Sequence, residues 1–150
     1  MVIFEGKGCE NLKAKEYLMQ IEKLDTIIKN KLIEKQQWED IALCMTARSD
    51  GERVQASGRP SKMADAMDRF VDIEKDINML VDRFVDTKRE VVSVIEQLDN
   101  PVEYDVLHRR FVQFKSLQEI ADKYKKRYEW ATTTQGRALA NVQKILDAKK

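Results

Sequence analysis

Glycine and proline are scarce in this chain of 150 residues, which contains five glycines and two prolines. It also lacks the runs of alternating β-branched residues that are typical of strands. Charged residues make up 35% of the sequence, and few helix breakers interrupt its long repeats. This composition favours long solvated helices over a sheet, so we expect an all-α protein.

Histidine and cysteine are equally rare. The single histidine, His108, excludes a cluster of histidine metal ligands and a relay between two histidines. Cys9 and Cys44 lack the close spacing of a zinc site or a disulfide framework, so we expect reduced thiols in a cytosolic protein. The chain has no Glu-x-x-His pair and no glycine-rich phosphate loop. We therefore expect no enzyme, no catalytic residues, no metal and no cofactor.

Long apolar runs and a signal peptide are missing as well, so we expect no membrane partner. The net charge is only +1, but it is unevenly placed. Residues 1–100 contain 16 Lys/Arg and 20 Asp/Glu, a net charge of −4, whereas residues 101–150 contain 11 and 6, a net charge of +5. A basic last third is a weak electrostatic signature of a polyanion partner.

Two long apolar repeats occupy the first hundred residues. Residues 11–48 carry side chains at intervals of three and four, namely Tyr17, Ile21, Leu24, Ile28, Trp38, Ala42 and Met45, with Lys31 and Lys35 where the repeat lapses. Residues 62–99 repeat the rhythm with Met63, Met67, Phe70, Ile77, Val81, Phe84, Val91, Ile95 and Leu98, interrupted by Glu74 and Lys88. A segment with two glycines and one proline, residues 49–62, joins them as a turn or loop. The pattern predicts a long antiparallel, coiled-coil-like two-helix hairpin.

Further apolar residues widen both stripes: Leu18, Ile27, Leu32, Ile41, Val71, Leu80, Val85 and Val92. A hairpin hides only one side of each stripe, so these positions predict a second copy of the chain, as a homodimer. We assign residues 1–99 to a helical hairpin that serves as an oligomerisation arm.

The last third carries signals for three short helices. Asn100 suits an N-cap and Pro101 a first helical position, and this helix is expected to end near Val112. Ser116 and Glu119 form an S-x-x-E capping box, so the next helix should begin at Leu117. After a basic turn at residues 125–127, a fifth helix completes a helix-turn-helix domain over residues 100–150. The expected inward side chains of the last two helices are Leu117, Ile120, Ala121, Tyr124, Ala131, Ala138, Leu139, Val142, Ile145 and Leu146.

The segments V-L-H-R-R-F, S-L-Q-E-I-A-D-K-Y and R-A-L, within residues 106–139, resemble region four of the sigma-70 family, which reads promoter DNA. A long helical part followed by this ending resembles late transcription regulators of phages of Gram-positive bacteria, of the ArpU and RinA types. The segments N-L-K-A-K-E-Y-L-M-Q-I-E-K-L-D and E-R-V-Q-A-S-G also resemble a related family of streptococcal prophage proteins. The resemblance implies a DNA-binding transcription regulator in the cytoplasm of a bacterial host cell.

The sigma-like pattern also implies roles for individual residues on and around the recognition helix. The expected readers of base edges are Tyr128, Glu129, Thr132 and Thr133. The expected phosphate contacts are Arg109, Arg110, Lys125, Lys126, Arg127 and Arg137.

The chain departs from the sigma-like pattern around the turn. Lys125 and Lys126 replace a small or acidic residue and an apolar one, and Arg127 replaces the usual Ser or Thr cap. In the recognition helix, the smaller or more polar residues Ala131 and Thr134 replace Val or Ile, and Gly136 lies in the helix interior. We therefore expect a weakly held recognition helix in which Trp130 packs inward.

Two hypotheses remain open at the level of sequence. In the first, the protein is a phage-type regulator that binds promoter DNA, and RNA polymerase is a further possible partner. In the second, it is a protein-interaction adaptor or antirepressor that binds another phage or host regulator and does not read DNA. A purely structural coiled-coil scaffold ranks last, because it leaves the capping box and the short helices without a purpose.

Overall fold

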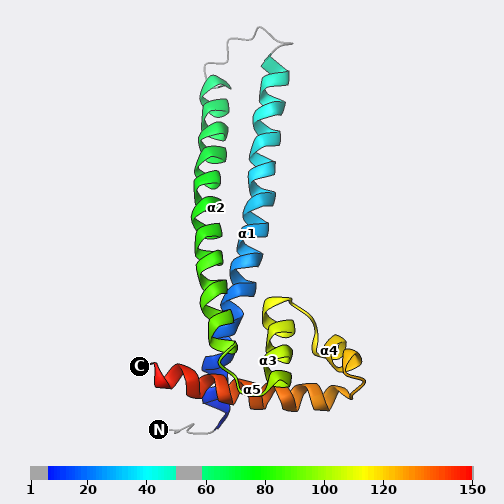
Figure 1. The fold of residues 1–150 in the computed structure, drawn as a ribbon. Coiled ribbons are helices and arrows are strands. Elements are labelled where there is room, and N and C mark those ends of the chain that lie inside the picture. Colours follow the sequence, from blue (N-terminus) through cyan, green and yellow to red (C-terminus); the bar gives the residue numbers. More distant parts are fainter. Residues whose placement is uncertain (1–6, 50–58, 150) are drawn as a thin grey trace, which may run out of the picture. The chain divides into compact units, whose positions relative to one another are not determined.

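The computed structural model describes residues 7–49 and 59–149, and only the backbone of residues 7–12, 45–49 and 59–61. This part of the chain contains five α-helices, one π-helical segment and no strand (Figure 1). The elements are α1 (Lys7–Ser49), α2 (Arg59–Ile95), α3 (Pro101–Leu107), η1 (His108–Val112), α4 (Leu117–Lys123) and α5 (Tyr128–Ala148). Helices α1 and α2 pack closely as a hairpin and smaller helices follow, which confirms the expected all-α fold.

The chain forms two compact units. The core unit comprises Met1–Lys23 and Phe84–Lys150, and the hairpin unit comprises Leu24–Arg83. The boundary predicted at residue 100 divides the chain differently, because the start of α1 and the end of α2 share buried side chains with α3 and α5.

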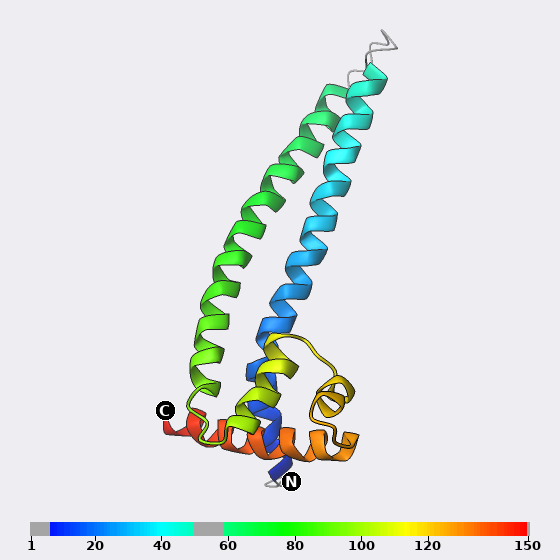
Figure 2. The ribbon, with the colours of Figure 1, turned by 45° about the vertical axis from the view of Figure 1, so that its right-hand side comes forward.

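One cluster of buried apolar side chains holds the core unit together: Ala14, Leu18, Ile21, Val91, Val94, Ile95, Leu107, Phe111, Ala138, Leu139 and Val142. Both ribbon views show α5 crossing the start of α1 and the end of α2 (Figures 1 and 2). The expectation that Leu18 is a spare position was wrong, because its side chain is fully buried in this cluster.

The hairpin unit has a thinner core, whose buried residues are Leu24, Ala42, Ala66, Ile73 and Ile77. The polar gaps of the two stripes meet across the hairpin: the Lys35 Nζ atom lies 3.7 Å from a Glu74 carboxylate oxygen and 5.1 Å from the centre of the Phe70 ring. Lys31 Nζ similarly lies 4.0 Å from Asp76. These pairings fit the register in which α1 and α2 are apposed. Residues 50–58 of the expected loop lie outside the described part of the chain.

The prediction for the buried face of α2 was partly wrong. Met67 and Val81 are exposed, at 43% and 40%, whereas Ala66, Ile73 and Val94 are buried. Intervals of three and four also link Ala64, Met67 and Val71, and further along Val81 and Val85, so the sequence carries a second, interrupted stripe one residue away from the first. The other seven positions predicted for residues 62–99 are buried or half-buried, so only Met67 and Val81 were assigned to the wrong stripe.

The apolar positions assigned to a second copy divide into three groups. Leu32, Ile41, Val71 and Val85 are exposed by between 39% and 48%, as expected of a surface that another chain could cover. Ile27, Leu80 and Val92 are half-buried within the chain. Leu18 is buried, as described above.

Candidate nucleic-acid interface

The third helix begins as the sequence predicted. The Asn100 side chain accepts a hydrogen bond from the Val102 amide at 2.9 Å, and Pro101 occupies the first helical position. The helix extends to Val112, but its last five residues form the π-helical segment η1. After this wider turn, Phe114 adopts a left-handed backbone (φ 61°) and the Lys115 amide donates to the Arg109 carbonyl at 2.8 Å.

The expected capping box starts α4 at Leu117. The Glu119 amide donates to Ser116 Oγ at 3.2 Å, and the Ser116 amide donates to Glu119 Oε2 at 2.9 Å. Two otherwise unpaired amides are therefore satisfied. The inward face of α4 is also as predicted, since Ile120 and Ala121 are buried and Leu117 and Tyr124 are half-buried.

The turn between α4 and α5 is a Schellman motif built on two lysines. Lys125 takes the left-handed conformation (φ 54°), its amide donates to the Asp122 carbonyl at 3.1 Å, and the Lys126 amide donates to the Ala121 carbonyl at 2.9 Å. Glycine is the usual residue at the left-handed position. The side chains of Lys125, Lys126 and Arg127 are all exposed. The turn thus places three cations directly before α5.

The first turns of α5 expose all four candidate base readers, and the Tyr128 side chain is 48% exposed. The Thr132 hydroxyl donates to the Tyr128 carbonyl at 3.1 Å, which leaves its lone pairs available to another donor. The opposite side of the helix packs inward as predicted, since Ala131, Ala138, Leu139 and Val142 are buried. Ile145 and Leu146 are only half-buried.

The six candidate phosphate ligands fall into two groups. Lys125, Lys126, Arg127 and Arg137 are exposed. Arg109 is already engaged, because its Nε donates to Asp105 Oδ2 at 2.9 Å and only 24% of its side chain is exposed. Arg110 is half-buried, and its guanidinium donates to the Lys115 carbonyl at 3.2 Å. The structure therefore brings the cations of the turn together but gives both arginines partners within the chain.

Asp105 is a polar residue of this surface that the sequence did not predict as part of the site. Its Oδ2 accepts hydrogen bonds from the Tyr124 hydroxyl and from Arg109 Nε, and Lys123 Nζ lies 3.9 Å away. Burial alone would raise the pKa of the Asp105 carboxyl, but these hydrogen bonds, with the charges of Arg109 and His108, outweigh it and lower the pKa. Only the D-x-x-x-R spacing to Arg109 hinted at this contact in the sequence.

A second polar link joins α3 to α5. Asn141 Nδ2 donates to Glu103 Oε2 at 2.8 Å, and the Glu103 side chain is buried. Helix α5 is therefore held to α3 both by apolar packing and by a hydrogen bond near its middle. This contact could not be predicted from the sequence, because Glu103 and Asn141 are 38 residues apart.

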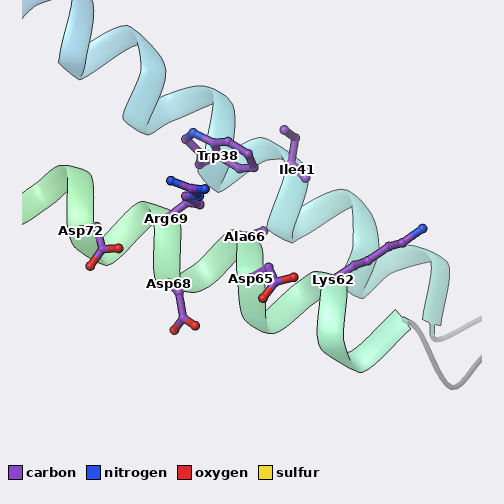
Figure 3. Close-up of a pocket in the computed structure, with 8 residues that line it drawn as sticks. All are labelled: Trp38, Ile41, Lys62, Asp65, Ala66, Asp68, Arg69 and Asp72. Carbon is purple, nitrogen blue, oxygen red and sulfur yellow. The ribbon is translucent and has the colours of Figure 1, made fainter.

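The hairpin unit contains an open groove of about 500 Å³ (Figure 3). Its lining residues are Trp38, Ile41, Lys62, Asp65, Ala66, Asp68, Arg69 and Asp72. Arg69 reaches towards Trp38, whereas Asp68 and Asp72 point away from α1. Small-molecule sites are mostly apolar, and the charges of both signs here lie on flexible surface side chains. We assign no ligand to this groove.

Within the described ranges, no group of three or more His, Cys, Asp or Glu side chains is placed to hold a metal ion. No helix in those ranges is both long and apolar enough to cross a membrane. Comparisons with protein-family models, curated proteins and solved structures found no match.

Proposed function

We propose that this protein is a phage-type transcription regulator that binds double-stranded DNA through α4, the basic turn and α5. The observation that carries the proposal is one exposed surface of the core unit. There, the cations of Lys125, Lys126 and Arg127 directly precede the exposed side chains of Glu129 and Thr132. Cations beside hydrogen-bonding side chains on one helix end are what a reader of the major groove requires.

In this proposal, the start of α5 enters the major groove. Glu129 accepts a hydrogen bond from a cytosine amino group, and Thr132 and Thr133 bond to a base edge or contact a thymine methyl group. Tyr128 lies at the edge of the groove. The cations of the turn, with Arg137, contact phosphates and fix the register without reading sequence. Arg109 and Arg110 contribute only if they exchange their present partners for phosphate.

The hairpin would bring two copies together as a homodimer in the bacterial cytoplasm. Two copies present two recognition helices, so the target should contain two half-sites. The resemblance of residues 106–139 to sigma region four also makes RNA polymerase a candidate partner. Self-association is supported by the apolar side chains exposed along the hairpin unit.

Selection from random duplex DNA tests this function, followed by affinity measurements over a range of salt concentrations. Replacing Tyr128, Glu129, Thr132 and Thr133 with alanine should remove the preference for the selected sequence and leave weak binding to any duplex. The Lys125→Ala/Lys126→Ala variant should bind all duplexes more weakly, with a salt dependence reduced by about two phosphate contacts. A matched control is Lys75→Ala/Lys88→Ala, which removes the same charge from exposed sites on α2. The proposal fails if no sequence is enriched, or if the fourfold alanine variant keeps the full preference.

A second candidate is an adaptor or antirepressor that binds another regulator. It is favoured by the exposed apolar side chains of the hairpin unit, among them Leu43 at 61% and Met79 at 70%. Recovery of one stoichiometric protein partner, with no enriched DNA, would favour this function over the first.

A further inference from the structure

The start of α5 lacks the side-chain contact that usually fixes a helix N-terminus. Arg127 occupies the N-cap position and its side chain makes no capping hydrogen bond. The Arg127 carbonyl accepts a hydrogen bond from the Trp130 amide at 3.0 Å, but the first bond of the regular α-helical pattern, from the Ala131 amide to the same carbonyl, is long at 3.4 Å. Ala131 is fully buried but contributes only a methyl group to the packing. Some other contact must restrain the turns that carry the candidate base readers.

Tyr124, the C-cap residue of α4, makes such a contact. Its ring lies 5.1 Å from the Trp130 ring on α5, at an interplanar angle of 47°. Its hydroxyl donates a hydrogen bond to Asp105 on α3. The Tyr124 side chain therefore contacts both α5, which would enter the major groove, and α3, which supports α5. We call Asp105, Tyr124 and Trp130 the tyrosine bridge.

The acceptor end of the bridge is itself held in place. Arg109 and Lys123 lie 2.9 Å and 3.9 Å from the same Asp105 oxygen, so the carboxylate is charged and oriented. Hydrogen bonds to a charged acceptor are stronger than those between neutral groups. The bridge thus links an aromatic contact on α5 to a fixed point on α3.

We propose that Tyr124 is a positioning residue, which holds the first turns of α5 in one orientation through Trp130 and Asp105. It takes the place of the larger apolar residues expected at positions 131 and 134. The consequence for DNA reading rests on the proposed function, whereas the restraint on α5 does not.

Hydrogen exchange of the backbone amides tests the restraint without DNA. Tyr124→Phe keeps the ring beside Trp130 and removes only the hydroxyl. The amides of residues 131–134 should then exchange roughly ten- to a hundredfold faster, the effect of losing one hydrogen bond to a charged acceptor, while those of residues 139–146 should keep their rates. In the wild-type background, Asp105→Asn retains an oxygen acceptor for the Tyr124 hydroxyl, so these amides should still exchange slowly. Asp105→Ala removes the acceptor and should speed their exchange as Tyr124→Phe does. Tyr17→Phe, which removes a hydroxyl from α1, is the matched control.

The idea is overturned if residues 131–134 exchange at the wild-type rate in Tyr124→Phe, or if the whole core unit exchanges faster by the same factor. A second measurement uses a duplex selected by the wild-type chain and a scrambled duplex. Tyr124→Phe should lower the ratio of the two affinities about tenfold and leave binding to the scrambled duplex unchanged. An unchanged ratio despite faster exchange would refute the role in presenting the readers. If the wild-type chain selects no duplex, the proposed function fails, and the exchange rates still decide the role of Tyr124.

Discussion

At the scale of single residues, two positions pay a conformational cost for the turns that shape the core unit. Phe114 and Lys125 both adopt left-handed backbone conformations, which residues other than glycine, asparagine and aspartate rarely take. The Phe114 ring packs against the apolar cluster, so its side chain has a reason to be there. The Lys125 side chain is exposed, and nothing in the fold requires it.

Lys125→Gly should therefore stabilise the protein by about 1 kcal/mol, raising the melting temperature by roughly 2–4 °C. Calorimetry or circular dichroism measures the change. Lys126→Gly is the control, since Lys126 is not in the left-handed region, and it should not stabilise. If Lys125 also contacts phosphate, the same glycine variant will bind DNA less tightly while melting at a higher temperature. A lower melting temperature would contradict the strain assigned to Lys125.

The contact between Tyr124 and Asp105 predicts how stability depends on pH. Burial, together with the hydrogen bond to and charge of Asp105, raises the pKa of Tyr124 from 10.0 to about 12. Because the pKa of Tyr124 is raised on folding, its contribution to the free energy of unfolding is fully present below pH 10 and is lost as the pH rises towards 12. The pKa of Asp105 is lowered from 3.8, so its contribution is present above about pH 4 and is lost at more acidic pH.

Unfolding free energies from urea titrations across the pH range should show both losses. Tyr124→Phe should weaken both, because the phenol is gone and Asp105 has lost a donor. Burial and the nearby Glu90 raise the pKa of Tyr17 to about 12 as well, so Tyr17→Phe should remove a separate share of the alkaline loss only. Equal acid sensitivity in wild type and Tyr124→Phe would count against the assignment.

At the scale of elements, the features that depend on residues close together in the sequence could be predicted, and those that depend on packing between helices could not. Asn100 with Pro101, and Ser116 with Glu119, fix helix starts through bonds that span two or three residues, so both starts could be predicted. Most of the buried face of α2 could also be predicted, but Met67 and Val81 were misassigned, because two apolar stripes compete there and only packing against α1 decides which one is buried. The tyrosine bridge was also missed, since it depends on the angle at which α3, α4 and α5 meet.

The hydrogen bond from Asn141 to Glu103 gives a prediction for the docking of α5 on α3. Asn141→Ala should destabilise the protein by about 1–3 kcal/mol, because it leaves a buried carboxylate oxygen without its donor. Chemical denaturation measures the loss. Asn78→Ala, at an exposed position on α2, should change stability by less than about 0.5 kcal/mol. Equal effects of the two variants would show that the link contributes nothing.

At the scale of the whole molecule, the two units bury apolar surface very differently. The core unit contains a cluster to which four helices contribute, whereas the hairpin unit has few buried side chains and several large exposed ones. A second copy covering the exposed stripe of α2 would remove Met67, Val71 and Val81 from water, in line with the proposed homodimer.

Val71→Glu/Val81→Glu should therefore convert a dimer into a monomer while the helical content is retained, because each dimer would have to bury four carboxylates. Light scattering at several protein concentrations measures the mass. Arg83→Glu is the matched control and should leave the dimer intact, because Arg83 is exposed and lies two residues from both Val81 and Val85, on another side of the helix. A wild-type chain that stays monomeric at all concentrations would exclude the proposed assembly.

The shared cluster also governs when the protein can fold during its synthesis. Ala14 and Leu18 share one buried cluster with Ala138 and Val142, so α1 can complete its packing only after α5 has been synthesised. Contacts between residues this far apart in sequence slow folding, and the nascent hairpin exposes apolar surface in the meantime. Translation that stops before Ala138 should thus release a chain prone to aggregation, however complete its two long helices are.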